Sequence, residues 1–86
     1  MTLTVIETLQ KARDRMQAGT HSGVFDAVRS LAGEASSLTR DCAYFALLDT
    51  AAAKHGAGSL ITLKRADGAA LALFDATIAR LLSEMH

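Results

Sequence analysis

The middle of the chain reads Ala43-Tyr-Phe-Ala-Leu-Leu-Asp-Thr-Ala-Ala-Ala53, and this stretch decides the fold. It is apolar almost all round, which is typical of a helix that other helices enclose. Thr39 is suited to be its N-cap, and Gly56 is a stop signal after it. The sequence therefore predicts a central, buried helix over residues 40–55.

Apolar residues at helical spacing predict two helices before this one. The first covers residues 5–18, with a capping box of Thr4 and Glu7 and a left-handed C-cap at Gly19. The second covers residues 23–35 and has Ser22 as its N-cap. The buried stripe of the first is Val5, Leu9, Ala12 and Met16, and that of the second is Val24, Ala27, Val28, Leu31 and Ala35, widened by Phe25 and Ala32.

A fourth helix is predicted from residue 66 or 69 to residue 85. Its apolar stripe is Leu71, Phe74, Ile78, Leu81, Leu82 and Met85. The preceding segment, 59–65, is ambiguous, because Ile61 and Leu63 alternate like a strand whereas Leu60 and Leu63 fit one helical turn. It is predicted as a short extra helix or an extended apolar segment.

Together these elements predict an all-α fold, a compact four-helix bundle that forms a single domain over residues 1–86. The N-terminus lacks the pattern of a secretory signal, and the apolar runs fall far short of the ~20 residues that cross a bilayer. Cys42 is the only cysteine, so an intrachain disulfide is excluded. We expect a cytoplasmic protein that does not associate with membranes.

The net charge is zero, from nine Lys and Arg against nine Asp and Glu. Proteins that bind nucleic acids usually carry a basic surplus, so this balance disfavours them as partners. A neutral chain also lacks long-range repulsion between copies, which favours a homo-oligomer such as a homodimer. Six Arg against three Lys, with 17 Ala, indicate a bacterial or phage genome rich in GC.

The residues that can ligate a soft metal are scattered. Cys42, His21, His55 and His86 form none of the local pairs that are typical of metal sites. Cys42 and His55 lie on one predicted helix about 20 Å apart, too far for a nucleophile and its base. The sequence predicts no metal, no cofactor and no catalytic residue.

Two aspartates stand inside apolar stretches and are the remaining candidates for catalysis. Asp75 is predicted at the edge of an apolar stripe, within reach of water, and Asp49 is predicted to be the more enclosed. Facing one cavity, they could act as general acid and base. The favoured interpretation is two boundary carboxylates that meet Arg or Lys partners or hydrogen-bond across helices.

Neither a phosphate loop nor a recognition helix is predicted. The glycine-rich 56–59 segment follows a helix instead of opening one, so it is interpreted as a cap and a turn. A protein that binds DNA would need its basic residues on one face. Those residues are Arg13, Arg15, Arg29, Lys64 and Arg65.

Small residues recur along the last predicted helix at alternating spacings of three and four. Such a repeat lets two helix backbones approach closely along a seam. The alternatives are packing against the 40–55 helix, a solvent-exposed face of good helix formers, and self-association. The residues predicted for protein interaction are Ala69, Ala72, Ala76, Ala79 and Ser83.

The opening helix that ends at Gly19, with the later Cys42, Ala43, Ala46 and Leu47, resembles small helical bacterial domains of unknown function. The resemblance implies no activity and adds no site residue. By elimination, the sequence predicts a non-catalytic protein that binds another protein, as an adaptor or inhibitor encoded by a bacterium or phage. The alternatives are a DNA-binding transcriptional regulator and, second, a small enzyme with a site near Asp49.

Overall fold

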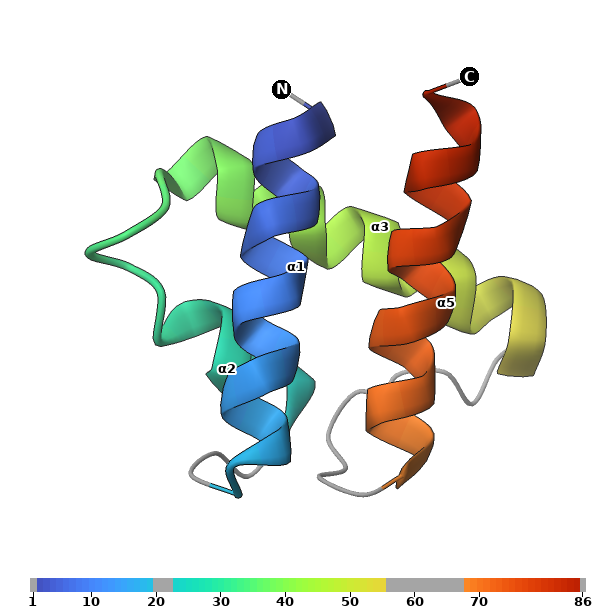
Figure 1. Cartoon of the computed structure of the whole chain (residues 1–86), viewed down its shortest axis with the longest axis horizontal. Coiled ribbons are helices and arrows are strands. Elements are labelled where there is room, and N and C mark those ends of the chain that lie inside the picture. Colours follow the sequence, from blue (N-terminus) through green and yellow to red (C-terminus); the bar gives the residue numbers. More distant parts are fainter. Residues whose placement is uncertain (1, 20–22, 56–67, 86) are drawn as a thin grey trace.

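The computed structural model describes residues 2–19, 23–55 and 68–85, and these residues are helices joined by turns, with no strand among them. The helices are α1 (Thr2–Gln17), α2 (Val24–Arg29), α3 (Ser37–His55) and α5 (Gly68–Glu84) (Figure 1). The predicted all-α class is confirmed. The 59–65 segment lies outside the described residues, so its two interpretations stay open.

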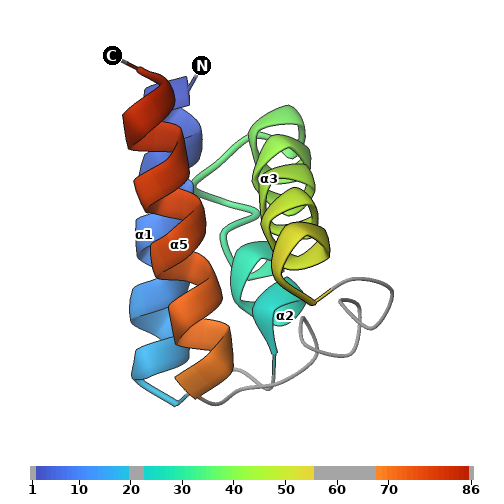
Figure 2. The ribbon, with the colours of Figure 1, turned by 90° about the vertical axis from the view of Figure 1, so that its right-hand side faces the viewer.

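The helices form two layers. α1 and α5 lie side by side and run in opposite directions, so the start of α1 and the end of α5 lie at the same end of the molecule (Figure 1). α2 and α3 form the second layer, in which α3 crosses behind both α1 and α5 (Figure 2). Each helix packs against at least two of the others in a compact four-helix bundle, as predicted.

One apolar core lies between the two layers, and each helix contributes to it. Burial of each large aliphatic or aromatic side chain stabilises the fold by about 1.5–3 kcal/mol. The largest core side chains that are almost completely shielded from solvent include Leu9 of α1, Val24 and Val28 of α2, Leu47 of α3, and Leu73 and Phe74 of α5.

The stripe and the end of α1 are as predicted, but its start is not. Val5, Leu9, Ala12 and Met16 are buried, and Gly19 ends the helix with a φ of 78°. The helix begins at Thr2, however, so Thr4 lies inside it and the predicted capping box is wrong. The carbonyl oxygen of Thr4 instead accepts a hydrogen bond of 2.9 Å from the Thr8 hydroxyl.

α2 spans six residues, so the prediction of a helix over residues 23–35 is wrong in length. Residues 30–34 continue as turns, stabilised by short-range hydrogen bonds such as Leu31 N–H to the Val28 carbonyl oxygen. Ser30 favours the change from helix to turns after Arg29, because its hydroxyl donates to the Ala27 carbonyl oxygen at 2.6 Å. Leu31 is still fully buried, whereas Ala32 is exposed and does not widen the core face. The predicted cap Ser22 lies outside the described residues.

α3 begins at Ser37, and its cap is Ser36 rather than the predicted Thr39. The Ser36 hydroxyl oxygen accepts a hydrogen bond of 3.1 Å from the backbone N–H of Thr39. The same hydroxyl donates to the Thr39 side-chain oxygen at 2.9 Å. Thr39 is therefore a buried residue of the first turn. The residue that accepts a backbone N–H of this turn is Ser36, three positions earlier.

α3 is central, because it packs against α1, α2 and α5, but the prediction that it is enclosed on all sides is wrong. Leu38 and Phe45 are 61% and 65% exposed. The reason is the two-layer arrangement, in which α1 and α5 cover only one side of α3 (Figure 2).

The buried side of α5 is rotated relative to the predicted stripe. Phe74 is fully buried as expected, but Leu82 and Met85 are exposed, and Leu71, Ile78 and Leu81 are only half-buried. α5 contacts both α1 and α3, so its most buried side faces the space between them. That side includes Thr77, whose hydroxyl donates to the Leu73 carbonyl oxygen at 2.8 Å and needs no further partner in the core. The buried residues are Ala70, Leu73, Phe74 and Thr77.

Candidate interaction surfaces

Of the four isolated residues that could ligate a soft metal, the structure describes the side chain of Cys42 alone. Cys42 is half-buried on α3. His21, His86 and the side chain of His55 lie outside what the structure describes. Within residues 2–19, 23–55 and 68–85, no three His, Cys, Asp or Glu residues are placed to hold a metal ion.

Both candidate catalytic aspartates are exposed, so the prediction that Asp49 is enclosed is wrong. Arg13 of α1 binds Asp75 through two hydrogen bonds, 2.5 Å from Nε to Oδ1 and 3.3 Å from Nη2 to Oδ2. A third bond of 3.1 Å joins the Arg13 guanidinium to Gln17. The interpretation of Asp75 as a boundary carboxylate that meets an Arg partner is confirmed.

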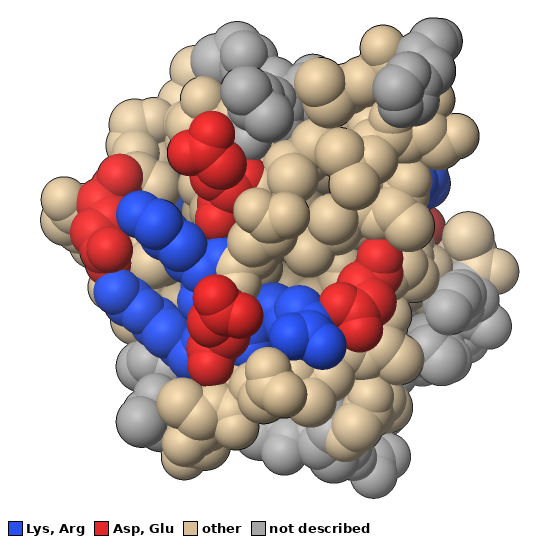
Figure 3. Space-filling view, in the orientation of Figure 1, with Lys and Arg blue, Asp and Glu red and all other residues tan. Residues whose placement is uncertain are grey.

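The other basic residues of α1 are also paired. Glu34, in the turn after α2, accepts a hydrogen bond from Arg15 and lies 3.7 Å from the Lys11 ammonium. Arg15 further donates to the Ser30 carbonyl and hydroxyl oxygens, both at 2.9 Å. Figure 3 shows the result, a surface on which blue and red side chains alternate. These contacts tie α1 to the second layer.

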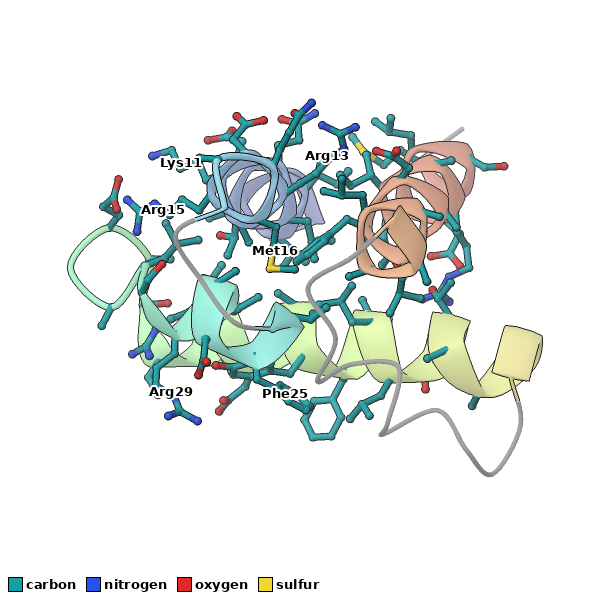
Figure 4. All side chains as sticks on the ribbon, turned by 90° about the horizontal axis from the view of Figure 1, so that it is seen from below. Lys11, Arg13, Arg15, Met16, Phe25 and Arg29 are labelled. Atoms are coloured by element: carbon teal, nitrogen blue, oxygen red, sulfur yellow. The ribbon has the colours of Figure 1, made fainter. Side chains whose placement is uncertain are left out.

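The basic residues of α1 and α2 do not share one face. Lys11, Arg13 and Arg15 project from the layer that holds α1, whereas Arg29 projects from the opposite side of the molecule (Figure 4). The other two basic residues of the predicted DNA face, Lys64 and Arg65, lie outside the described residues.

The residues Ala69, Ala72, Ala76, Ala79 and Ser83 form what we call the alanine face of α5. All are exposed except Ala76, which is half-buried. They lie on the side of α5 away from Ala70, Leu73, Phe74 and Thr77, the residues buried in the core. Packing of this face against α3, one of the alternatives from the sequence, is therefore not observed.

A second exposed surface lies on α3, and sequence reasoning missed it. We call it the Phe45 face. Its members occur at spacings of three, four and seven residues, so they share one side of the helix, and all are exposed. The signal in the sequence that this side of the helix is exposed was the pair of aspartates four residues before and after Phe45. The Phe45 face consists of Leu38, Asp41, Phe45, Asp49 and Ala52.

Aromatic contacts fix the position of α3 next to this face. The rings of Phe25 and Tyr44 are tilted, with centroids 5.2 Å apart. The Tyr44 hydroxyl donates to the Phe25 carbonyl oxygen at 3.3 Å. Phe25 points to the side of α2 away from α1 (Figure 4). Leu48, three residues after Phe45 and four after Tyr44, is half-buried and packs against the core.

A hollow between α1 and the turn after α2 has a volume of about 50 Å³. This is room for one or two water molecules and too little for an organic substrate. Its lining consists of Thr4, Glu7, Thr8, Lys11, Leu31, Glu34 and Ala35.

In the part of the chain that the structure describes, every helix is too short or too polar to cross a membrane. No protein-family model matches the chain, and it has no significant match among curated proteins or solved structures.

Proposed function

We propose that the protein acts without catalysis, by binding another protein as an adaptor or inhibitor. The observation that carries this proposal is the 65% exposure of Phe45 in the middle of a regular helix. A large aromatic side chain in water contributes little to the fold, whereas aromatic residues supply much of the binding energy at protein interfaces. The Phe45 face is therefore the primary proposed surface.

The charge distribution supports this function over the two alternatives. Lys11, Arg13 and Arg15 are engaged with carboxylates, so they are less available to phosphates than free basic side chains. Asp49, the centre of the proposed enzyme site, projects from an open helix face, where substrate and water would not be separated.

The alanine face is the second proposed surface, because its exposure leaves it accessible to a helix of a partner or of a second copy. Small side chains permit close approach of two backbones but supply little binding energy of their own. We therefore expect it to support an interface rather than to anchor one.

Affinity capture from a lysate of the source organism tests the proposal. The wild-type protein is compared with Phe45→Ser, with the double variant Ala72→Arg and Ala76→Arg, and with Gln10→Arg as a matched change at another exposed position. We expect a recovered partner to be lost with Phe45→Ser and retained with Gln10→Arg.

Two results would contradict the proposal. One is recovery of the same partners and the same oligomeric state with all variants, which would mean that neither surface is functional. The other is binding to duplex DNA that persists at about 0.2 M salt, because non-specific contacts to phosphates weaken steeply in that range. That result would favour the transcriptional regulator.

A further inference from the structure

The Phe45 face combines one large apolar side chain with two carboxylates, and this combination specifies a partner. We propose that it receives an amphipathic helix of another protein, with an apolar stripe flanked by Lys or Arg residues. This inference rests on the proposed function and adds the chemistry of the partner.

The spacing of the charged residues gives the geometry of the match. Asp41 and Asp49 lie four residues before and after Phe45, so the three side chains follow one ridge of α3. The two aspartates are separated by about 12 Å along the helix, at 1.5 Å per residue. A partner helix that packs on Phe45 can place basic side chains beside both carboxylates.

Neither aspartate is neutralised within the described residues. Asp41 and Asp49 form no ion pair or hydrogen bond there, in contrast to Asp75, which binds Arg13. Arg40 is adjacent to Asp41 in sequence, but it is half-buried, its Nε atom is shielded from solvent, and it forms no ion pair with either aspartate in the described structure. The chain as a whole is neutral, so the acidic excess on the Phe45 face is local.

One basic side chain, that of Arg29, projects from α2 on the side of the molecule away from α1 (Figure 4). Arg29 is exposed and lies on the same side as Phe25 (Figure 4). It belongs to another helix and forms no ion pair with either aspartate of the Phe45 face in the described structure. Within the part of the chain that the structure describes, the ridge through Asp41, Phe45 and Asp49 therefore remains acidic.

The same charges disfavour a symmetric pairing of two copies through this face. Antiparallel α3 helices would bring Asp41 of one copy to Asp49 of the other, and parallel helices would bring each aspartate to its own equivalent. Like charges face each other in both cases, which disfavours association. A partner with basic residues removes this repulsion, and the acidic ridge repels the phosphates of nucleic acids and anionic lipids.

Synthetic helical peptides test the proposal directly. The probe is a fluorescent amphipathic peptide of Leu and Lys, and its control has Glu in place of every Lys. Binding is measured by fluorescence anisotropy at several salt concentrations. We expect the Lys peptide to bind and the Glu peptide not to bind.

Variants then assign the site. We expect Phe45→Ser to weaken binding at least about tenfold, as at an interface anchor. The double variant Asp41→Asn and Asp49→Asn is expected to weaken binding about three- to tenfold at low salt and to flatten its salt dependence. The matched control removes two exposed carboxylates of α1, with Glu7→Gln and Asp14→Asn, and is expected to change binding less than twofold. Circular dichroism and the urea midpoint establish that each variant is folded.

Three results would overturn the proposal. The first is that the Lys peptide does not bind. The second is that the α1 control variant weakens peptide binding as much as the double variant of Asp41 and Asp49. The third is that the mass of the protein in sedimentation rises with protein concentration and falls with Phe45→Ser. The last would assign the face to a second copy. A different result is that a captured partner requires Phe45 for binding and yet is not displaced by the Lys peptide. In that case the protein-binding function stands, and the inference that the partner presents a basic amphipathic helix is wrong.

Discussion

Arg13 and Asp75 join α1 to α5 across 62 positions of the chain, with two hydrogen bonds between their side chains. The geometry is favourable, but the side chains are 28% and 57% exposed, so solvent competes with the pair. Exposed ion pairs of this kind stabilise proteins by about 0.2–1 kcal/mol. The pair therefore aligns two helices without contributing a large part of the free energy of unfolding.

A double-mutant cycle measures this contribution. We expect Arg13→Ala and Asp75→Ala to show a coupling of about 0.5–1 kcal/mol in urea unfolding at low salt, falling towards zero in about 1 M NaCl. The same cycle with Asp49→Ala in place of Asp75→Ala is the control, because Asp49 is also exposed but does not pair with Arg13, and its coupling should be near zero. A coupling above about 2 kcal/mol, or one insensitive to salt, would contradict this account.

The two aspartates also show what sequence patterns leave undetermined for single residues. Asp49 and Asp75 stand in similar apolar contexts, and the sequence predicted that the former would be enclosed. The partner of Asp75 is 62 positions away, and only the packing of α1 against α5 selects it. Helical spacing gives the direction of a side chain from its own helix but not which helix covers it.

Among the helices, the start of α3 depends on one hydroxyl. Ser36 accepts the backbone N–H of Thr39, which otherwise has no partner in the helix. We expect Ser36→Ala to lower the free energy of unfolding by about 1 kcal/mol, measured as a shift in the urea midpoint at constant slope.

Thr4→Ala is the matched control, because Thr4 is predicted from the sequence as a cap but lies inside α1. Thr4 is an exposed residue inside α1, so its replacement should change the free energy of unfolding by less than about 0.5 kcal/mol. A larger loss from Thr4→Ala than from Ser36→Ala would mean that α1 starts at the capping box and that the present boundaries are wrong.

The accuracy of the predicted helices follows the strength of their local signals. Gly19 ends α1 with a positive φ that glycine readily adopts, and the stripe from Val5 to Met16 is strictly periodic, so both were predictable. The end of α2 at Arg29 was not predicted. Ser30 supplies a local hydrogen bond to the Ala27 carbonyl oxygen, but the bonds that Arg15 of another helix forms with this turn leave no signal in the spacing of the residues. The Phe45 face was missed because an apolar run predicts burial, whereas the number of neighbouring helices decides it.

At the scale of the whole molecule, the core joins residues from both ends of the chain. Leu9 of α1 and Phe74 of α5 belong to the same buried cluster as Val28 and Leu47. None of these helices buries its apolar side alone, so loss of one exposes the core to water. We infer that the bundle unfolds as one cooperative unit.

Two spectroscopic probes test this cooperativity. The chain has one tyrosine and no tryptophan, so tyrosine fluorescence reports on Tyr44 at the contact of α2 and α3, whereas far-ultraviolet circular dichroism reports on all helices. We expect both signals to change at the same urea concentration, and a calorimetric heat-capacity change of about 1.0–1.3 kcal/mol/K for a chain of this length. Loss of the tyrosine signal at lower urea than the helical signal would show that α2 and α3 separate first. In that case the shared core would not unfold as one cooperative unit.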